Sequence, residues 1–442
     1  MSNNLYQLRE YGVIRKASDF ADSITSSIDE LYLPDSSFDS LFNFILENQS
    51  TGVEKDPPFS LFIKSKRKQI KVKNYVGVVE TSDGVKIEIL PKIHLTNSKD
   101  EVKDTKGIFL KMLRHLKDSP FINISEAHLN LKQNFPILEV FIKSFIDEAE
   151  RVFTSGIKSG YLLEEENLKF LRGKLLVGKN IKHNASNKTK FYCQYSEFSQ
   201  DIPHNRIIKT ALVKLTRITS DYTNLAALNK VLTNLENVNI SSNLALELAA
   251  CNSENRFFKK YQKLIDWSKI FLLNKAFTNF SGTSLNVAIL FPMERIFEDY
   301  IASLFSKFAD GFRVKAQDKS YFLVEKHLEA GKFRLRPDLL LDSHDEVERI
   351  VIDTKWKLID ETSPSKNYNI TSADMYQLFA YGKKYSVNDK LSKLAMIYPL
   401  NSNFEDKLPP FYYYENGLKL EVFPFDFEAD AEGQVKSIIA SL

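Results

Sequence analysis

The sequence predicts an α/β protein, mixed α+β when the whole chain is considered, because strand-like and helix-like patterns alternate along it. The first third carries short runs of β-branched and aromatic residues separated by turn residues, which is typical of strands. The middle third places its apolar residues mainly at helical spacing. The last third follows the order helix, strand, strand, helix, strand, which indicates an α/β core on a small mixed sheet.

The composition indicates a folded protein of two or three domains. The chain has 442 residues, of which 43% are hydrophobic and 26% charged, and this length exceeds one ordinary core. No stretch approaches 18 uninterrupted apolar residues, so we expect no membrane association. The N-terminus lacks the features of a signal peptide, and the two cysteines cannot form a disulfide framework or a cysteine-rich zinc site. We therefore expect a cytoplasmic protein.

The net charge of +3 is close to neutral for this length. It neither supports nor excludes DNA binding, because a basic surface could be local or a partner could hold the duplex. One basic cluster lies near the N-terminus: Lys64, Lys66, Arg67, Lys68, Lys71 and Lys73. It indicates either a solvated strand face with charged edge protection or a contact with DNA or an acidic partner.

Strands are expected in the first third at 61–64, 70–79 and 85–92. Ser82-Asp83-Gly84 is a hairpin turn between the last two, and Pro91 should end the third strand or place it at an edge. Helices are expected at 108–113, 136–153 and from 205 to about 275. Between the last two helices we expect a strand at 171–177, a polar loop at 182–190 and a strand at 191–195.

The segment from Gly173 to Asn180 nearly matches a phosphate-binding loop, Gly-x-x-x-x-Gly-Lys-[Ser/Thr]. Asn180 lacks the hydroxyl group that would bind magnesium, and the apolar run before it fits a strand better. We therefore expect this chain to bind no nucleotide. His183 and His204 have no partners at metal-ligand or triad spacing and are interpreted as ordinary polar residues.

The most informative stretch is 336–357, where two apolar runs of strand length, 336–342 and 350–357, flank a polar turn. Side chains alternate along a strand, so Asp353, Lys355 and Lys357 emerge on one face. A hairpin would place Asp338 alongside Asp353. An amphipathic helix is expected before the hairpin at 292–305, and a helix at 371–381 and a strand at 394–399 after it.

Two carboxylates and an ammonium group around one point suit metal-dependent phosphodiester hydrolysis. Mg²⁺, or Mn²⁺, would be held by Asp338, Asp353 and the carbonyl oxygen of Thr354. Lys355 would orient the attacking water or stabilise charge in the transition state. Pro-Asp and Asp-x-Lys are short motifs, and the alternative is that two strand-end aspartates lie near lysines by chance.

Four further residues could support this site. Glu298, on the helix before the hairpin, could add a carboxylate or contact a metal-bound water. Gln377 and Tyr381 share one face of the helix after the hairpin, where an amide and a phenol could bind a phosphate or a metal water. Lys357 could reach a flanking phosphate. For each helix the alternative is an ordinary solvent-exposed face.

Together these motifs resemble the nuclease domain of McrC, the cleaving subunit of McrBC-type modification-dependent restriction systems, within the PD-(D/E)xK superfamily. Segments upstream are also similar to that family: 75–78, 87–93, 171–175, 192–201 and 205–209. The resemblance covers most of the chain from about Asn74 onward.

The resemblance implies three domains. These are a β-rich N-terminal domain at 1–125 that binds a partner, a mainly helical middle region at 126–280, and a C-terminal PD-(D/E)xK restriction-endonuclease-like domain at 281–442. It also implies a Mg²⁺-dependent endonuclease that cuts double-stranded DNA together with a hexameric McrB-like AAA+ GTPase, whose hydrolysis it stimulates. Two alternatives remain: a stand-alone nuclease, and a catalytically silent adaptor that activates an AAA+ partner.

Overall fold

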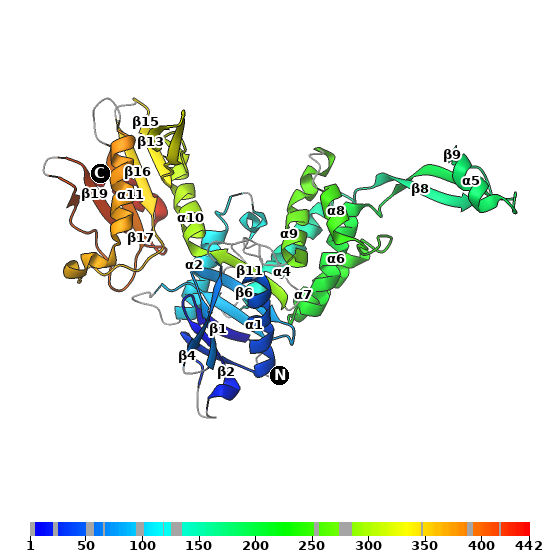
Figure 1. Cartoon of the computed structure of the whole chain (residues 1–442), viewed down its shortest axis with the longest axis horizontal. Helices are drawn as coiled ribbons and strands as arrows, with labels where there is room; N and C mark the ends of the chain where they lie inside the picture. The colour runs from blue at the N-terminus through cyan, green and yellow to red at the C-terminus, as the bar shows by residue number, and fades with distance from the viewer. Residues whose placement is uncertain are drawn as a thin grey trace. The chain divides into compact units, whose positions relative to one another are not determined.

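The computed structural model describes residues 5–20, 25–49, 57–64, 67–93, 101–117, 119–124, 135–251, 256–273, 285–345, 348–386, 392–414 and 417–442. It divides into two compact units, one made of Met1–Ile137 with Ala276–Leu442 and the other of Leu138–Lys275 (Figure 1). Helices and strands alternate in both, which confirms the predicted mixed α/β class. No described helix combines the length and apolar character that a membrane crossing requires.

The N-terminal part of the first unit is built from two four-stranded sheets with the orders β1-β7-β6-β11 and β3-β2-β5-β4. Their apolar faces and helix α1 share one core, as expected for amphipathic elements that must bury one face. The elements are β1 (Leu5–Arg9), β2 (Val13–Lys16), β3 (Glu30–Leu33), α1 (Asp35–Gln49), β4 (Phe59–Lys64), β5 (Arg67–Val72), β6 (Tyr75–Thr81), β7 (Lys86–Leu90), α2 (Glu101–Leu113) and β11 (Leu285–Pro292).

The C-terminal part of the first unit is organised on a six-stranded mixed sheet with the order β12-β15-β16-β17-β19-β18. One face packs on α10 through Phe297 and Trp356, and the other packs on α11 through Leu378 and Tyr381. The elements are α10 (Met293–Phe308), β12 (Phe312–Ala316), β13 (Phe322–His327), β14 (Ala330–Arg334), β15 (Leu339–Ser343), β16 (Arg349–Thr354), α11 (Ser372–Lys384), β17 (Lys393–Pro399), β18 (Phe411–Tyr412), β19 (Lys419–Phe425) and α12 (Ala431–Ser441).

The second unit is a helical body with a three-stranded sheet, β8-β10-β9. Trp267 is buried among Phe141, Phe145 and Phe271. In Figure 1 the strands β8 and β10 extend as a ribbon from the helices of this unit. The elements are α4 (Ile137–Phe153), β8 (Gly160–Leu168), β9 (Lys174–Leu175), α5 (Val177–Asn184), β10 (Phe191–Ser199), α6 (Pro203–Ile218), α7 (Tyr222–Thr233), α8 (Leu244–Cys251) and α9 (Gln262–Leu273).

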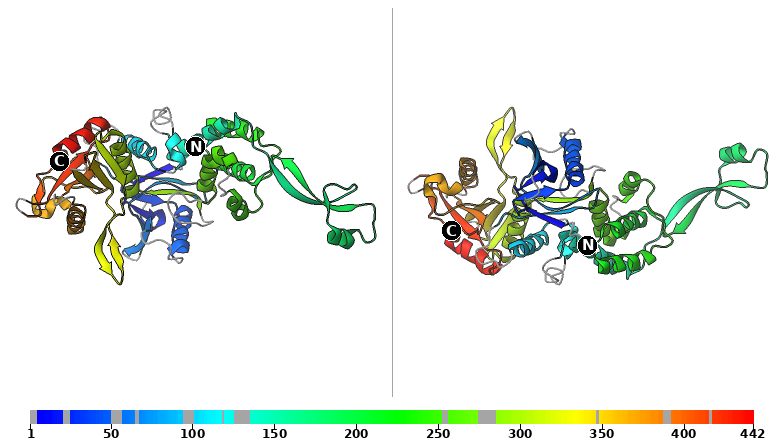
Figure 2. Two further views of the ribbon diagram at one scale, coloured as in Figure 1. Left: turned by 90° about the horizontal axis from the view of Figure 1, so that it is seen from above. Right: turned by 90° about the horizontal axis from the view of Figure 1, so that it is seen from below.

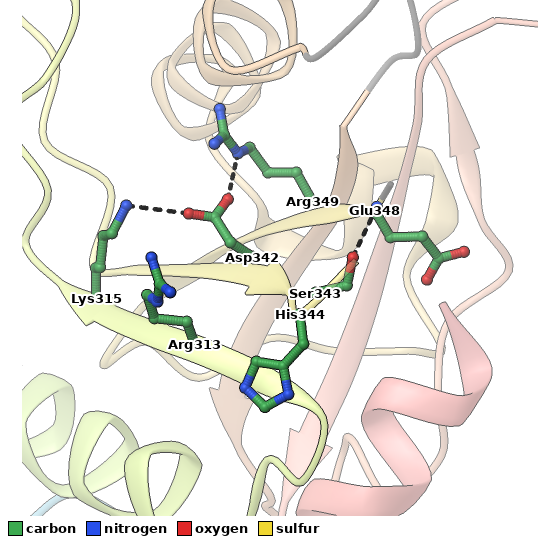
Figure 3. Close-up of a pocket in the computed structure, with 7 residues that line it drawn as sticks. All are labelled: Arg313, Lys315, Asp342, Ser343, His344, Glu348 and Arg349. Atoms are coloured by element: carbon green, nitrogen blue, oxygen red, sulfur yellow. Dashed lines mark hydrogen bonds and ion pairs between the residues drawn. The ribbon is translucent and has the colours of Figure 1, made fainter. Parts of the chain in front are cut away.

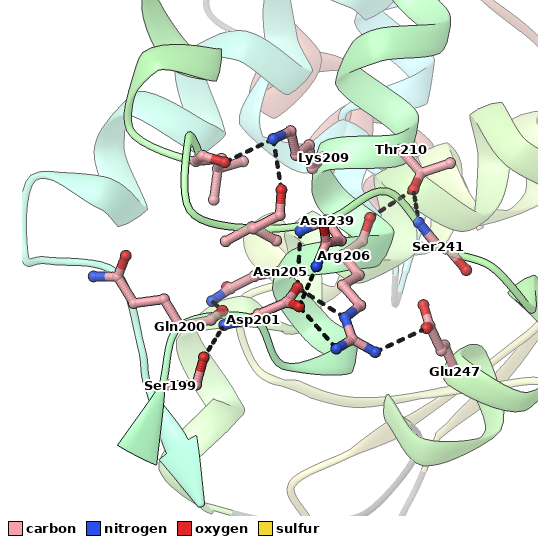
Figure 4. A network of polar contacts seen from close by, with 12 residues as sticks. Ser199, Gln200, Asp201, Asn205, Arg206, Lys209, Thr210, Asn239, Ser241 and Glu247 are labelled. Atoms are coloured by element: carbon pink, nitrogen blue, oxygen red, sulfur yellow. Dashed lines mark hydrogen bonds and ion pairs between the residues drawn. The ribbon is translucent and has the colours of Figure 1, made fainter. Parts of the chain in front are cut away.

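A polar network fixes the start of α6 within this unit (Figure 4). Arg206 donates two hydrogen bonds to the carboxylate of Asp201, of 2.8 and 2.9 Å, and a longer one of 3.4 Å to Glu247. Asn239 donates to the same Asp201 carboxylate from its backbone and its side chain. These hydrogen bonds and the Arg206 charge hold the pKa of Asp201 below its usual value, against the effect of burial.

Three sequence predictions in these regions need correction. The run 70–79 is two strands in different sheets, because the chain turns at Lys73 and Asn74 between β5 and β6. The expected strand at 171–177 is only the two-residue β9, and Val177 starts helix α5 instead. That helix also occupies the beginning of the loop expected at 182–190. Lys66 of the basic cluster and Lys275 at the predicted helix end lie outside the described residues.

Candidate active site

The hairpin of β15 and β16 brings Asp338 and Asp353 to the same end of the sheet. Leu339 pairs with Ile352 in the antiparallel register, so the residues next to this pair, Asp338 and Asp353, lie side by side. Oδ2 of Asp338 accepts a 2.7 Å hydrogen bond from the backbone N–H of Thr354 and a 2.8 Å bond from its hydroxyl group. The side chain of Asp353 is 1% exposed. The predicted hairpin is therefore present with the predicted pairing.

Lys355 lies next to Asp353 and connects it to helix α11. Its Nζ is 2.6 Å from Oδ2 of Asp353 and donates a 3.1 Å hydrogen bond to Oε1 of Gln377. Gln377 in turn donates to the hydroxyl group of Tyr381 at 2.8 Å. That hydroxyl group donates to the carbonyl oxygen of Arg336 at 2.9 Å. Both helix residues thus hold the position of the lysine and of the strand that leads to Asp338.

Helix α11 is fixed at its N-terminus by a capping box. The side chain of Thr371 accepts from the N–H of Asp374, and the Asp374 carboxylate accepts from the N–H of Thr371, an arrangement typical of helix N-termini. Lys357 donates to both carboxylate oxygens of the same Asp374, at 3.0 and 2.8 Å. Its ammonium group is therefore tied to the start of the helix.

The carboxylate of Asp353 is buried without full compensation. Neither of its oxygens has a hydrogen-bond partner among the described residues, and its ion-pair neighbour is Lys355, whose Nζ lies 2.6 Å from Oδ2. Burial, and then the charge of Asp338, raise the pKa of Asp353 to about 7, while Lys355 opposes this shift. Burial also raises the pKa of Asp338, against its hydrogen bonds from Thr354. A buried charge of this kind calls for a further cation.

The pKa of Lys355 is raised as well. Burial works against the ammonium group of Lys355, but the nearby carboxylates of Asp353 and Asp338 outweigh burial and raise its pKa. Lys355 therefore stays charged at neutral pH.

Glu298 on α10 extends the acidic group. Burial and the charge of Asp338 raise the pKa of Glu298 to about 7, and a hydrogen bond from Gln317 opposes the shift. Glu294, one helical turn earlier, is exposed. Glu298 thus lies close enough to Asp338 for its pKa to respond.

The residues present fit a magnesium ion. Mg²⁺ is commonly held by one or two carboxylates together with water, and Asp338, Asp353 and the backbone carbonyl of Thr354 offer oxygen ligands of this type. The buried Asp353 carboxylate, which Lys355 compensates only in part, is the observation that favours a cation here. Among the described ranges, no group of three or more His, Cys, Asp or Glu side chains is arranged to hold a metal.

A polar hollow of about 190 Å³ lies at the opposite end of the same strands (Figure 3). Asp342 bridges Lys315 at 3.0 Å and Arg349 at 2.6 Å, and these hydrogen bonds hold the pKa of Asp342 below its usual range despite burial. Sequence reasoning missed this cluster because two of its basic residues, Arg313 and Lys315, come from β12, which was not predicted as a strand.

Sequence reasoning also missed Glu10 and Lys92, which lie behind the candidate site. Nε1 of Trp356 donates a 2.7 Å hydrogen bond to Glu10, and Nζ of Lys92 donates to the carbonyl oxygen of Trp356 at 3.2 Å. No local pattern marks residues so far from Trp356 in the chain.

Comparison with known proteins decides the family. The model of the McrBC 5-methylcytosine restriction system component matches residues 70–399. The chain belongs to this family. The resemblance drawn from the sequence motifs is thereby confirmed.

Solved structures similar to this McrBC-family chain come from Thermococcus gammatolerans. A chain of the refined half-complex from the tetradecameric assembly of McrB AAA+ hexamers with bound McrC has a TM-score of 0.69 and 16% identity, covering 99% of each chain. A chain of the cryo-EM structure of the McrBC complex has a TM-score of 0.48 and 18% identity, covering 70% of this chain and 89% of that one. No curated protein matches the chain. The first match shows that this McrBC-family chain shares its fold.

Proposed function

We propose that this McrBC-family chain is the Mg²⁺-dependent DNA endonuclease subunit of a McrBC-like restriction system. The observation that carries the proposal is the buried Asp353 carboxylate, which accepts no hydrogen bond from the described residues and lies beside Asp338 and Lys355. Together with Pro337, these residues match the Pro-Asp and Asp-x-Lys motifs of PD-(D/E)xK nucleases. We accordingly assign 281–442 as the nuclease domain.

In this proposal Asp338, Asp353 and the carbonyl of Thr354 hold the metal. When bound, Mg²⁺, or Mn²⁺ in its place, supplies charge neutralisation for the phosphate and a water of lowered pKa. Lys355 provides a fixed positive charge where negative charge develops, because Gln377 and Asp353 hold its Nζ in place.

The supporting residues act on that geometry. Tyr381 fixes both Gln377 and the carbonyl of Arg336, so it positions the lysine and the strand leading to Asp338. Glu298 adds a carboxylate whose pKa of about 7 lets it hold or release a proton near neutral pH. Lys357 fastens the strand end to α11 through Asp374.

The partner in this proposal is a McrB-like AAA+ GTPase hexamer. The T. gammatolerans match is described as McrB AAA+ hexamers with bound McrC, and we carry that class of partner to this chain. The β-rich segment 1–125 would dock the hexamer, while 126–280 forms the helical middle region. Stimulation of GTP hydrolysis by this chain belongs to the same proposal. Double-stranded DNA is the substrate.

The test combines the purified chain, a McrB-like AAA+ partner, GTP and methylated plasmid DNA, with either Mg²⁺ or a chelator. Cleavage that requires the chain, the partner and Mg²⁺ supports the proposal. Cutting by the chain and metal alone would instead favour a stand-alone nuclease. Stimulated GTP hydrolysis with intact DNA would favour a silent adaptor.

A further inference from the structure

Strands β13 and β14 form a two-stranded ribbon that does not belong to the six-stranded sheet. Both views in Figure 2 show it, in yellow, extending away from the strands and helices of the C-terminal part. It is inserted between β12 and β15, so the chain leaves the candidate site at Gln317 and returns to it at Asp338. The ribbon is therefore joined to that site at both of its ends.

The base of the ribbon is anchored to the C-terminal core. Tyr321 packs edge-on against Tyr385, with ring centroids 4.7 Å apart, and its carbonyl oxygen accepts a 2.9 Å hydrogen bond from the N–H of Leu335. Glu325 forms a 2.7 Å ion pair with Lys384 of α11. These contacts hold the first half of β13 and the end of β14, and leave the turn of the ribbon free of the sheet.

The ribbon exposes large apolar side chains, Leu328 at its turn and Phe333 nearer its base. Leu328 is 86% exposed and Phe333 is 75% exposed. Leu328 and Glu329 form the turn with positive φ angles of 46° and 66°, a conformation for which Asn and Gly are preferred. An exposed leucine at such a turn has no role in the internal packing of the described structure. Leu323, which lies opposite Phe333 in the pairing register, is also 45% exposed, and neighbouring exposed apolar residues of this kind mark a binding surface.

The ribbon is also strongly basic relative to the rest of the chain. Across 319–336 the net charge is +3, equal to that of the whole chain. Five cations contribute: Lys319, Lys326, Lys332, Arg334 and Arg336. The two acids of this segment are already paired, Glu325 with Lys384 at 2.7 Å and Glu329 with Lys326 at 3.3 Å. The surplus is thus positive charge on exposed side chains.

We propose that the β13–β14 ribbon binds duplex DNA beside the phosphodiester that is cut. A two-stranded ribbon fits the major groove of B-DNA, where exposed apolar groups such as Leu328 and Phe333 can contact thymine methyl groups. The basic side chains then neutralise backbone phosphates. This inference rests on the proposed nuclease function, which makes DNA the occupant and explains the continuity with the catalytic hairpin.

The stems of the ribbon connect DNA contact to the candidate site. The N–H of Gln317 donates a 2.8 Å hydrogen bond to the carbonyl oxygen of Asp338, and its side chain donates to Glu298. A strand of six residues, the length of β13, spans about 20 Å at about 3.3 Å per residue. At 3.4 Å per base pair, the ribbon reaches about six base pairs from the cut.

The test measures binding of a 30-base-pair duplex by the full-length chain, by fluorescence anisotropy in EDTA so that no cleavage occurs. The variant Lys326→Ala/Lys332→Ala/Arg334→Ala removes three cations. We expect about tenfold weaker binding and a salt slope smaller by about 2.7, which is three phosphate contacts at about 0.9 each. The variant Leu328→Ser/Phe333→Ser should weaken binding while leaving the salt slope unchanged.

The matched control is Lys182→Ala/Lys188→Ala/Lys260→Ala, which removes three exposed lysines of the other unit and should bind as the wild type does. An unchanged affinity in both ribbon variants, or a wild-type chain that binds no duplex, would overturn the inference. Loss of AAA+ partner binding with DNA affinity intact would also overturn it, because the ribbon would then be a protein-docking surface. Duplex binding through the ribbon without Mg²⁺-dependent cleavage would refute the nuclease proposal alone.

Discussion

Nε1 of Trp356 donates a 2.7 Å hydrogen bond to Oε1 of Glu10, a residue 346 positions earlier in the chain. Trp356 directly follows Lys355, so this bond ties the backbone of the candidate site to the N-terminal strands. The same Oε1 accepts a 3.1 Å hydrogen bond from the N–H of Lys92. The Glu10 carboxylate is 3% exposed, and its Oε2 accepts no hydrogen bond from the described residues. The hydrogen bond between Trp356 and Glu10 therefore requires a buried carboxylate that is only partly compensated.

The variant Glu10→Gln should be more stable than the wild type at alkaline pH. Burial raises the pKa of Glu10 from 4.5 to about 7, although Lys92 opposes the shift. An acid whose pKa is raised in the folded state does not lower the free energy of unfolding below its unfolded pKa. Its destabilising effect grows as pH rises and is complete above its folded pKa. Glutamine keeps an acceptor for Trp356 without ionising. We expect a gain on the order of 1–3 kcal/mol at pH 8 that disappears near pH 4.5.

Urea unfolding at pH 8, 6 and 4.5 measures that difference. If Glu10→Gln has the free energy of unfolding of the wild type at every pH, ionisation of Glu10 does not destabilise the fold. If the variant is less stable at every pH, the carboxylate is required for the bond to Trp356.

The variant Lys355→Ala should lose DNA cleavage by about 10²–10³-fold, the usual effect of removing one preorganised charge from a transition state. The ammonium group lies 2.6 Å from Asp353, where no other described lysine is equally close. The control is Lys315→Ala, at the far end of the same strands beside Asp342. We expect its cleavage rate to stay within about threefold of the wild type. Equal losses in both variants would indicate a general effect on folding.

Magnesium should stabilise the chain more at pH 8 than at pH 6. Metal ligands must be deprotonated, and the pKa of Asp353 is raised to about 7 by burial and by Asp338. The apparent affinity of the chain for Mg²⁺ should therefore fall about tenfold per pH unit below 7. The rise in melting temperature that Mg²⁺ causes should shrink in step. Scanning calorimetry with 0 and excess Mg²⁺ at both pH values measures this. If Mg²⁺ raises the melting temperature of the variant Asp338→Asn as much as that of the wild type, the ion is bound elsewhere.

Local patterns predicted the elements that carry the candidate site. The pairing of Asp338 with Asp353 follows from two apolar runs and one short turn, and helix α11 follows from the helical pattern at 371–381. Both depend on residues close together in the chain. Helix α10 follows from the amphipathic pattern at 292–305, and its apolar residues Ile296 and Tyr300 are buried.

Elements stabilised by distant contacts were missed. Strand β11 pairs with β6, about 200 residues earlier in the chain. No hairpin turn joins the two strands, so no local signal indicates their pairing. Strand β12 alternates apolar and charged residues over only five positions, a local strand signal that was present but was not used. Val177 was assigned to a strand because its apolar neighbours outweighed the polar residues of α5 that follow. Glu10 could not be found at all, since its role depends on tertiary contact with Trp356.

The central claim is that Asp353 holds the metal that cuts DNA. The most direct measurement is the cleavage rate of the variant Asp353→Asn with Mg²⁺, GTP and the AAA+ partner, beside Asp342→Asn as a matched control from the same sheet. We predict that Asp353→Asn cuts at least 10³-fold more slowly while its partner binding and stimulation of GTP hydrolysis remain those of the wild type. Cleavage at the wild-type rate by Asp353→Asn would contradict the account.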